Sequence, residues 1–214
     1  MTTNGTWYPP AAGTGGFLLT NPPFTMTTTP RVIGLWSPTP GCGKSTVASL
    51  IQELEWPGCE IIPFAETLKD MLQMLLMGAG YSERQSYQAL YDPEGKTERL
   101  FCIPGSPTPR DLMQTLGTEW GRYRVHPDLW TTIWRAKVRS AGVMVIADDV
   151  RFPNEAQAIR DVGGELWCIR SPLGQPAGEH ISEGQLGDEP FDVIINNNGT
   201  LEQLRTAVHH ALKG

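Results

Sequence analysis

The most informative stretch of this chain is a glycine-rich loop that joins a predicted strand to a predicted helix. RVIGLWS, residues 31–37, is an apolar run of strand length, and residues 44–55 carry apolar side chains at helical spacing. The loop between them contains GCGKST, residues 41–46. Glycines allow successive backbone N–H groups to turn toward one point, and the following helix adds its positive end. A strand, a loop and a helix in this order therefore predict a site that holds a phosphate group.

The loop matches a phosphate-binding pattern, Gly, four free positions and Gly-Lys-Ser/Thr, at all but one position. Gly43, Lys44 and Ser45 match, whereas Pro38 takes the place of the first glycine. Lys44 is expected to reach the β- and γ-phosphates of ATP, and the Ser45 hydroxyl is expected to bind Mg²⁺. Pro38 cannot donate a backbone hydrogen bond, but the amides that face the phosphates lie later in the loop. The expected ATP-binding residues are Gly41, Cys42, Gly43, Lys44, Ser45 and Thr46.

The composition indicates an ordinary globular chain. Its 214 residues suffice for one domain, 40% of them are hydrophobic, and the formal net charge is -6. A protein that mainly grips nucleic acid favours a basic face, so we do not expect stable nucleic-acid binding. No apolar run has membrane-spanning length and no signal segment opens the chain, so we expect no membrane association. The four cysteines show no metal-ligand spacing, so we expect reduced thiols and a cytoplasmic location. The oligomeric state stays open, a homodimer included.

The first thirty residues differ from the rest of the chain. Residues 1–30 carry no charged side chain and are crowded with Thr, Pro and Gly. Such a segment has little to bury, so we expect it to be a disordered leader and the folded domain to occupy residues 31–214. Met26 lies just before the first predicted strand, and translation from this residue would still yield the whole predicted domain.

From residue 31 onward, short apolar runs alternate with stretches of helical spacing. The predicted strands are residues 31–37, 60–65, 142–149, 164–170 and 191–197. The predicted helices are residues 44–55, 66–78, 110–122, 126–142, 154–162 and 199–212. Residues 80–108 are polar and punctuated by Pro and Gly, which indicates an insertion, and residues 171–190 read as a loop. Strands that alternate with helices predict a parallel sheet covered on both faces.

Two acidic residues end the predicted strand 142–149. A phosphate-binding loop commonly works with a carboxylate at the end of a neighbouring strand, which holds Mg²⁺ directly or through water. Asp148 and Asp149 stand at that place. The alternative is that one of them caps the next helix. We expect at least one of the two to serve the metal, and we favour Asp149.

The predicted helix 110–122 repeats polar side chains at every fourth position. These are Arg110, Gln114, Thr118 and Arg122. Leu112, Leu116 and Trp120 take roughly the opposite side and are expected to face a core. By itself the polar stripe also fits a solvated surface. Two arginines and an amide on one stripe nevertheless suit a phosphate group and the edge of a base.

Several longer stretches then follow one another along the chain. They are FAETLKDML, RDLMQTLGTEWGR followed by HPDLW, DDVRFPNEAQAI, GGELWCIR, HISE and DVIINNNGTLEQL. In this order and spacing they resemble the deoxynucleoside monophosphate kinases of bacteriophages, from about Val32 to the C-terminus, with Pro38 as a departure. The resemblance implies a three-layer α/β P-loop kinase fold, in which helices flank a parallel sheet. It also implies a small helical acceptor-binding region at about residues 66–141 and a lid at about residues 171–190.

The activity that the resemblance implies is transfer of the γ-phosphoryl group of ATP to a deoxynucleoside 5′-monophosphate, with Mg²⁺ as cofactor. The implied catalytic residues are Lys44, Arg151 and Arg170, and the implied metal residues are Ser45 and Asp149. The implied substrate-binding residues are Lys69, Arg110, Gln114, Arg122, Trp130, Asn154 and Glu155. Trp130 is a candidate for stacking on the base. In the lid, Glu183 accompanies His180, which either contacts a phosphate or anchors the loop.

Two other functions remain open at this point. A kinase of the same fold could act on a modified pyrimidine within DNA, although the acidic charge of the chain counts against it. A non-catalytic module could instead bind ATP and use the loop as a switch for a protein partner, for which Pro38 is the only support. Assays of ADP release with free monophosphates and with an oligonucleotide, and calorimetry of ATP binding, separate these functions.

Overall fold

The computed structural model describes residues 30–55, 57–172, 186 and 189–214. The predicted leader before residue 30 and the predicted start at Met26 lie outside the described residues, and so do His180 and Glu183 of the predicted lid. Within the described part of the chain, none of the helices is both long and apolar enough to cross a membrane.

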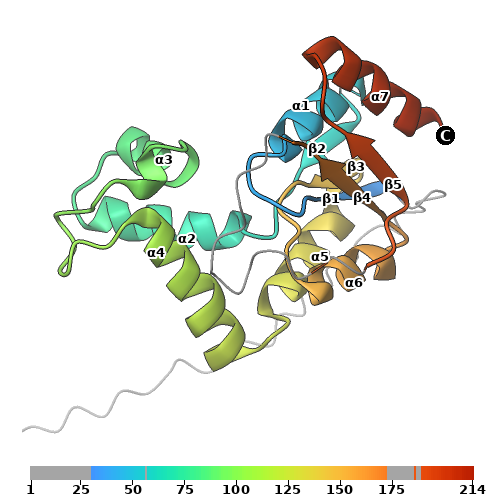
Figure 1. The fold of residues 1–214 in the computed structure, drawn as a ribbon. Helices are drawn as coiled ribbons and strands as arrows, with labels where there is room; N and C mark the ends of the chain where they lie inside the picture. Colours follow the sequence, from blue (N-terminus) through green and yellow to red (C-terminus); the bar gives the residue numbers. More distant parts are fainter. Residues whose placement is uncertain (1–29, 56, 173–185, 187–188) are drawn as a thin grey trace, which may run out of the picture.

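The centre of the fold is a parallel sheet of five strands in the order β2-β3-β1-β4-β5 (Figure 1). The strands are β1 (Val32–Trp36), β2 (Cys59–Ile61), β3 (Met144–Ala147), β4 (Glu165–Arg170) and β5 (Val193–Asn196). β1 lies between β3 and β4, so the next two strands of the chain, β2 and β3, lie on one side of it, and the last two, β4 and β5, lie on the other. Ligands of open parallel sheets bind at the carboxyl ends of the strands, at such a switch point. The topology therefore places the loop after β1 where a ligand is expected.

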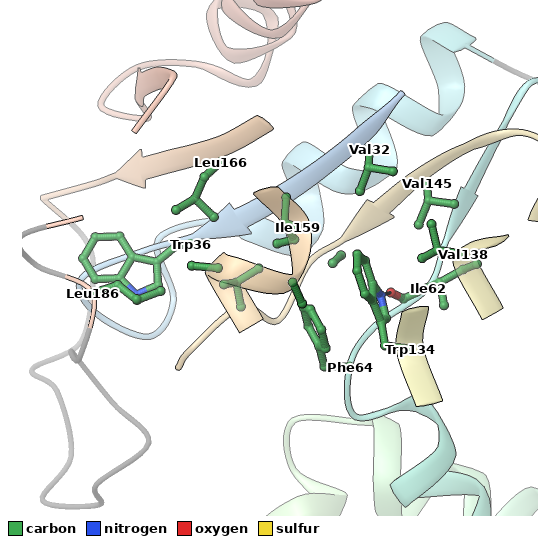
Figure 2. Packing of buried hydrophobic residues seen from close by; sticks show 14 of the residues in the cluster. Val32, Trp36, Ile62, Phe64, Trp134, Val138, Val145, Ile159, Leu166 and Leu186 are labelled. Atoms are coloured by element: carbon green, nitrogen blue, oxygen red, sulfur yellow. Dashed lines mark hydrogen bonds between the residues drawn. The ribbon is translucent and has the colours of Figure 1, made fainter. Parts of the chain in front are cut away.

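Helices cover both faces of this sheet (Figure 1). On one face lie α1 (Lys44–Glu55) and α7 (Leu201–Lys213), and on the other lie α5 (Leu129–Ala141) and α6 (Pro153–Asp161). Alternate strand residues point to opposite faces, so Ile33 and Leu35 join one apolar core while Val32 and Trp36 join the other. Figure 2 shows the second of these cores, which packs α5 and α6 on the sheet. The predicted three-layer α/β fold is confirmed.

The other helices form a lobe to one side of the sheet (Figure 1). They are α2 (Glu66–Gly78), α3 (Glu83–Tyr91), the 3-10 turn η1 (Gly95–Thr97), α4 (Pro109–Gln114) and the π-helix η2 (Thr115–Val125). Leu68, Leu72 and Leu76 of α2 pack with Leu90 and Leu100 in a core that belongs to this lobe. The lobe therefore has its own apolar support beside the sheet.

Helix α3 lies in the segment 80–108, which its polar composition predicted to be an insertion and which falls within the predicted helical region of about residues 66–141. Its first turn carries a capping box, in which the Ser82 side chain accepts from the Gln85 N–H and the Gln85 side chain accepts from the Ser82 N–H. A serine followed three residues later by glutamine is a sequence signal for a helix start. Ser82 and Gln85 therefore mark the start of α3 in the sequence itself.

The helix predicted for residues 110–122 forms in two parts, because α4 continues as the π-helix η2 from Thr115. Leu112 and Leu116 pack against the lobe core, as predicted. Trp120 is 42% exposed, so the prediction that it faces a core is wrong. A π-helix forms i→i+5 hydrogen bonds and holds more residues per turn than an α-helix, so Trp120 does not fall above Leu116 as α-helical spacing predicts.

Candidate active site

A cavity of about 320 Å³ opens where the sheet meets the lobe. Its walls come from the loop after β1, the start of α2, the turn η1, one face of α4 and η2, and residues 149–155 after β3. All four members of the polar stripe, Arg110, Gln114, Thr118 and Arg122, line it. The fold therefore brings the predicted phosphate loop and the predicted acceptor stripe to one site.

The loop after β1 has the backbone shape that its glycines predict. Gly41 and Gly43 have φ angles of 78° and 96°, in the left-handed region that glycine adopts without a steric penalty. Residues 38–40 form one edge of the cavity, and Thr39 Oγ1 lies 3.1 Å from Cys42 Sγ across the loop. Pro38 is exposed at this edge, so a proline in the first position is compatible with the curled loop.

Lys44 reaches across the loop at the mouth of the cavity. Its Nζ donates to Ser37 Oγ at 2.6 Å, and Ser37 Oγ donates to the Thr39 carbonyl oxygen at 2.8 Å. Burial lowers the pKa of Lys44, and the neighbouring Arg151 lowers it further. An ammonium group that has lost water and lies near another cation gains stability from an anion. Lys44 is thus placed to bind a phosphate group.

Six cationic side chains line the cavity. They are Lys44, Lys69, Lys96, Arg110, Arg122 and Arg151. All of them except Lys96 are residues that the sequence predicted for the site. Arg122 forms an ion pair with Glu155, and Lys69 Nζ lies 4.3 Å from the centre of the Tyr91 ring. The chain as a whole carries a formal charge of -6, so this concentration of positive charge indicates a site for a strongly anionic ligand.

Lys96 reaches the cavity from η1, inside the segment 80–108 that was predicted to be an insertion. Gly95 packs so closely on α3 that a Cβ atom there would collide with the Gln88 carbonyl oxygen. Burial lowers the pKa of Lys96, and the nearby cations Lys69 and Arg110 lower it further. A lysine in a polar segment has no local pattern that marks it as a site residue. Only the packing of η1 against α3 reveals its position.

Asp148 is the carboxylate that lies against the phosphate loop. Ser45 Oγ donates to Asp148 Oδ2 at 3.3 Å. Burial raises the pKa of Asp148, and the negative charge of Asp149 raises it further. A carboxylate whose charged form is disfavoured by burial is stabilised by a nearby cation. Hydroxyl and carboxylate oxygens are also the ligands that Mg²⁺ prefers, so Ser45 and Asp148 together fit this metal.

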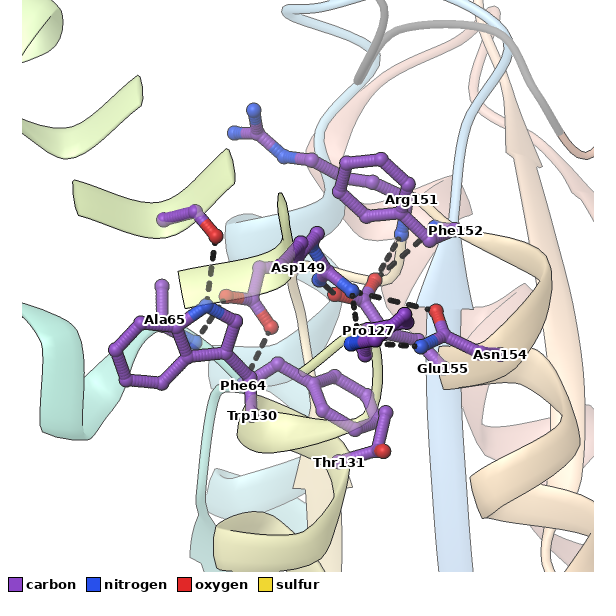
Figure 3. Close-up of polar contacts among 12 residues, drawn as sticks. Phe64, Ala65, Pro127, Trp130, Thr131, Asp149, Arg151, Phe152, Asn154 and Glu155 are labelled. Atoms are coloured by element: carbon purple, nitrogen blue, oxygen red, sulfur yellow. Dashed lines mark hydrogen bonds and ion pairs between the residues drawn. The ribbon is translucent and has the colours of Figure 1, made fainter. Parts of the chain in front are cut away.

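Asp149 instead ties two elements of the fold together (Figure 3). Its Oδ1 accepts a hydrogen bond from the Phe64 N–H at 2.8 Å, and its Oδ2 accepts one from the Ala65 N–H at 3.0 Å. These bonds join the end of β3 to the start of α2 and engage both carboxylate oxygens. The contacts favour Asp148 as the metal residue over Asp149, the residue favoured from the sequence.

An ion pair between Arg122 and Glu155 forms the floor of the cavity. The Nη2–Oε1 distance is 2.5 Å, and the two side chains are 10% and 4% exposed. Glu155 Oε2 also accepts hydrogen bonds from the N–H groups of Arg151 and Phe152. Burial raises the pKa of Glu155 to about 7, although Arg122 acts in the opposite direction. The Arg122 guanidinium lies 3.9 Å from the centre of the Phe152 ring, so packing as well as charge holds it.

Three other predicted site residues are engaged elsewhere or lie outside the cavity. Trp130 lines the cavity, but it is 3% exposed and its Nε1–H donates to the Gly117 carbonyl oxygen at 2.8 Å. Within the described part of the chain, Asn154 and Arg170 are not among the residues that line the cavity. Asn154 Nδ2 donates to the Pro127 carbonyl oxygen at 3.0 Å, and Arg170 is exposed at the end of β4. Base stacking by Trp130 and catalysis by Arg170 stay predictions.

Comparison with known proteins gives a consistent result. The chain matches the family model described as deoxynucleotide monophosphate kinase over residues 80–208, which is more than half of its length. It is 30% identical over 182 residues to a protein of Acanthamoeba polyphaga mimivirus provisionally named a deoxynucleotide monophosphate kinase, covering 78% of this chain and 89% of that protein.

Two phage enzymes are also similar over shorter stretches. Identity to the deoxynucleotide monophosphate kinase of Enterobacteria phage T4 is 27% over 139 residues, 58% of each chain. Identity to the deoxynucleoside-5′-monophosphate kinase of Escherichia phage T5 is 36% over 69 residues, 32% of this chain and 27% of that enzyme. Among solved structures, the Mycobacterium tuberculosis APS kinase in complex with AMPPNP and APS has a TM-score of 0.41 and 14% identity, covering 86% of this chain and 99% of that one. A likeness at this last level bears on neither the site nor the substrate.

The family model spans the turn η1, the polar stripe of α4 and η2, and the Arg122–Glu155 floor, so it covers much of the cavity described above. The mimivirus relative extends the similarity over most of the chain. The resemblance inferred from the sequence motifs is thereby confirmed. The chain belongs to the deoxynucleotide monophosphate kinase family and is a kinase.

Proposed function

We propose that the chain transfers the γ-phosphoryl group of ATP to a deoxynucleoside 5′-monophosphate and releases ADP and the deoxynucleoside diphosphate. The observation that carries the proposal is one cavity that joins the phosphate loop to the Arg122–Glu155 floor and is lined by six cations. Its volume of about 320 Å³ suits a small-molecule site. The names of the viral relatives support the same class of substrate.

The cations supply what phosphoryl transfer asks of a protein. An oxygen of the acceptor monophosphate attacks the γ-phosphorus, and the bond from this phosphorus to the bridging oxygen of ADP breaks. Catalysis rests mainly on positioning and on positive charge around the moving group. We assign Lys44 and Arg151 to the transferred group, and Lys69, Lys96 and Arg110 to the acceptor phosphate. No dedicated base is needed, because the attacking oxygen is already anionic.

We propose that Mg²⁺ binds beside Ser45 and Asp148. Among the described residues, no group of three or more His, Cys, Asp or Glu side chains could hold a metal ion. One carboxylate and one hydroxyl are nevertheless typical for Mg²⁺ in such enzymes, because phosphate oxygens and water complete its shell. When bound, the metal neutralises phosphate charge and orients the donor.

The acceptor nucleoside is assigned to the end of the cavity that η2 forms. Gln114 and Thr118 offer polar groups there, and Trp130 and Phe152 offer apolar surface. The same combination of hydrogen-bonding groups and flat apolar side chains suits a nucleobase. Asn154 holds the turn at Pro127, to which Arg122 also donates, so we assign it a positioning role behind the floor.

A substrate panel tests the proposal. ADP release is measured with each common deoxy- and ribonucleoside monophosphate, with ATP or GTP as donor, beside an oligonucleotide acceptor. We expect turnover with at least one deoxynucleoside monophosphate and none with the oligonucleotide. Lys44→Ala should abolish turnover, whereas Arg84→Ala, which replaces an exposed arginine on α3, should not. ATP binding without turnover on the whole panel would contradict the proposal.

A further inference from the structure

The turn that follows β5 contacts the phosphate loop directly. Asn197 Nδ2 donates a hydrogen bond to the Cys42 carbonyl oxygen at 3.0 Å, although 155 positions separate the two residues. The backbone N–H of Asn197 donates to the Arg170 carbonyl oxygen at 2.7 Å, which anchors the asparagine to the end of β4. The Asn197 side chain thus reaches from the edge of the sheet into the loop.

Gly43 leaves the space that this contact needs. Its φ angle is 96°, and a Cβ atom at this position would lie 2.6 Å from Asn197 Nδ2. A residue with a side chain would therefore be strained here and would displace the asparagine amide. The glycine and the asparagine are matched to each other in shape.

The bond to Cys42 sets the direction of a backbone amide. A trans peptide is planar, so the C=O of Cys42 and the N–H of Gly43 point in opposite directions. With the oxygen held by Asn197, the Gly43 N–H points away from Asn197. The permissive backbone of glycine would otherwise allow this peptide to turn over. A turned peptide would present a carbonyl oxygen, rather than an N–H group, to the anion in the loop.

We infer that Asn197 is a positioning residue for ATP, which holds the Cys42–Gly43 peptide so that the Gly43 N–H faces the triphosphate. The inference rests on the proposed function, in that the loop binds ATP. Pro38 and Pro40 supply no backbone N–H, so the loop depends more strongly on the amides that remain. Within the described residues Asn197 is not part of the cavity wall, so its loss should spare the acceptor side.

Two variants test the inference, Asn197→Ala and Asn197→Asp. The aspartate keeps the shape of the side chain, so it maintains the packing, but it cannot donate to the Cys42 carbonyl oxygen. Calorimetry with a non-hydrolysable ATP analogue and Mg²⁺ measures the donor side without any acceptor. We expect both variants to bind the analogue about tenfold more weakly, in line with the loss of one part-buried hydrogen bond. In steady-state assays the KM for ATP should rise by a similar factor, while the KM for the monophosphate stays unchanged.

Asn196→Ala is the matched control, because Asn196 is the exposed neighbour whose side chain points to the opposite face of β5. It should bind the analogue as the wild type does. Wild-type affinity for the analogue in both Asn197 variants would overturn the inference, and so would an equal loss on the acceptor side. If the wild type binds the analogue but phosphorylates no monophosphate, the proposed function fails, while the binding comparison still decides the role of Asn197.

Discussion

Arg122 and Glu155 are joined by an ion pair of 2.5 Å, Nη2 to Oε1, that is almost completely shielded from water at the floor of the cavity. The pair connects η2 to the start of α6, so it links the lobe to the sheet. Glu155 also accepts hydrogen bonds from the backbone N–H groups of Arg151 and Phe152. The same carboxylate therefore supports the floor of the cavity and the segment that carries Arg151, a proposed catalytic residue.

Removal of Arg122 should destabilise the protein strongly. Arg122→Ala leaves the buried Glu155 without its charged partner, and loss of one partner of a buried pair costs about 3–5 kcal/mol. Urea unfolding measures this loss. Arg205→Ala breaks the surface pair with Glu53 and serves as the control, for which we expect little change. Equal effects of the two substitutions would show that burial of the Arg122 pair has no energetic consequence.

The stability of the protein should respond to pH through Glu155. Burial raises the pKa of this carboxyl from 4.5 to about 7 in the folded state. Between these values the folded chain holds a proton that the unfolded chain has released, so protonation stabilises the fold. This contribution is complete below pH 4.5 and is lost as the pH rises through 7. Glu155→Gln cannot titrate, so the free energy of unfolding of the wild type should fall relative to that of the variant across this range.

Lys96 should contribute to turnover even though it comes from the lobe. Lys96→Ala removes one cation from a cluster that also contains Lys69 and Arg110, and we expect kcat/KM for the monophosphate to fall at least about tenfold. Lys96→Arg should recover part of this loss because it keeps the charge. Arg84→Ala on the exposed side of α3 is the control for lobe stability. An unchanged kcat/KM in Lys96→Ala would show that Lys96 does not contribute to the site.

Substitution of Asp148 should impair activity, whereas substitution of Asp149 should impair stability. Asp148→Asn should lower kcat and raise the Mg²⁺ concentration needed for half-maximal activity, without loss of stability, because burial already disfavours its charge. Asp149→Asn should instead destabilise the fold by about 1–3 kcal/mol, because its carboxylate accepts two backbone N–H groups. A Mg²⁺ titration and urea unfolding of both variants measure the two effects. A higher Mg²⁺ requirement in Asp149→Asn, together with a loss of stability in Asp148→Asn, would identify Asp149 as the metal residue instead.

Local signals predicted most of the elements in the described chain. The bounds of α1 and α2 agree with the predicted helices 44–55 and 66–78, because apolar spacing and a terminal glycine are properties of the segment itself. β1 likewise falls inside its predicted run. The prediction that Trp120 faces a core was wrong because this residue lies in a π-helix, which the side-chain pattern does not reveal.

The residues alone determined that a glycine-shaped loop with Lys44 and Ser45 follows a buried strand, and that a polar stripe follows Pro109. Those features depend only on residues that are close together in the chain, so the sequence alone predicts them. The tertiary structure decided which aspartate meets the loop, that Lys96 lines the cavity, and that Asn197 holds Cys42. These contacts join positions 103 apart for Ser45 and Asp148 and 155 apart for Cys42 and Asn197. Packing of the strands and the lobe brings them together, and no local pattern carries that information.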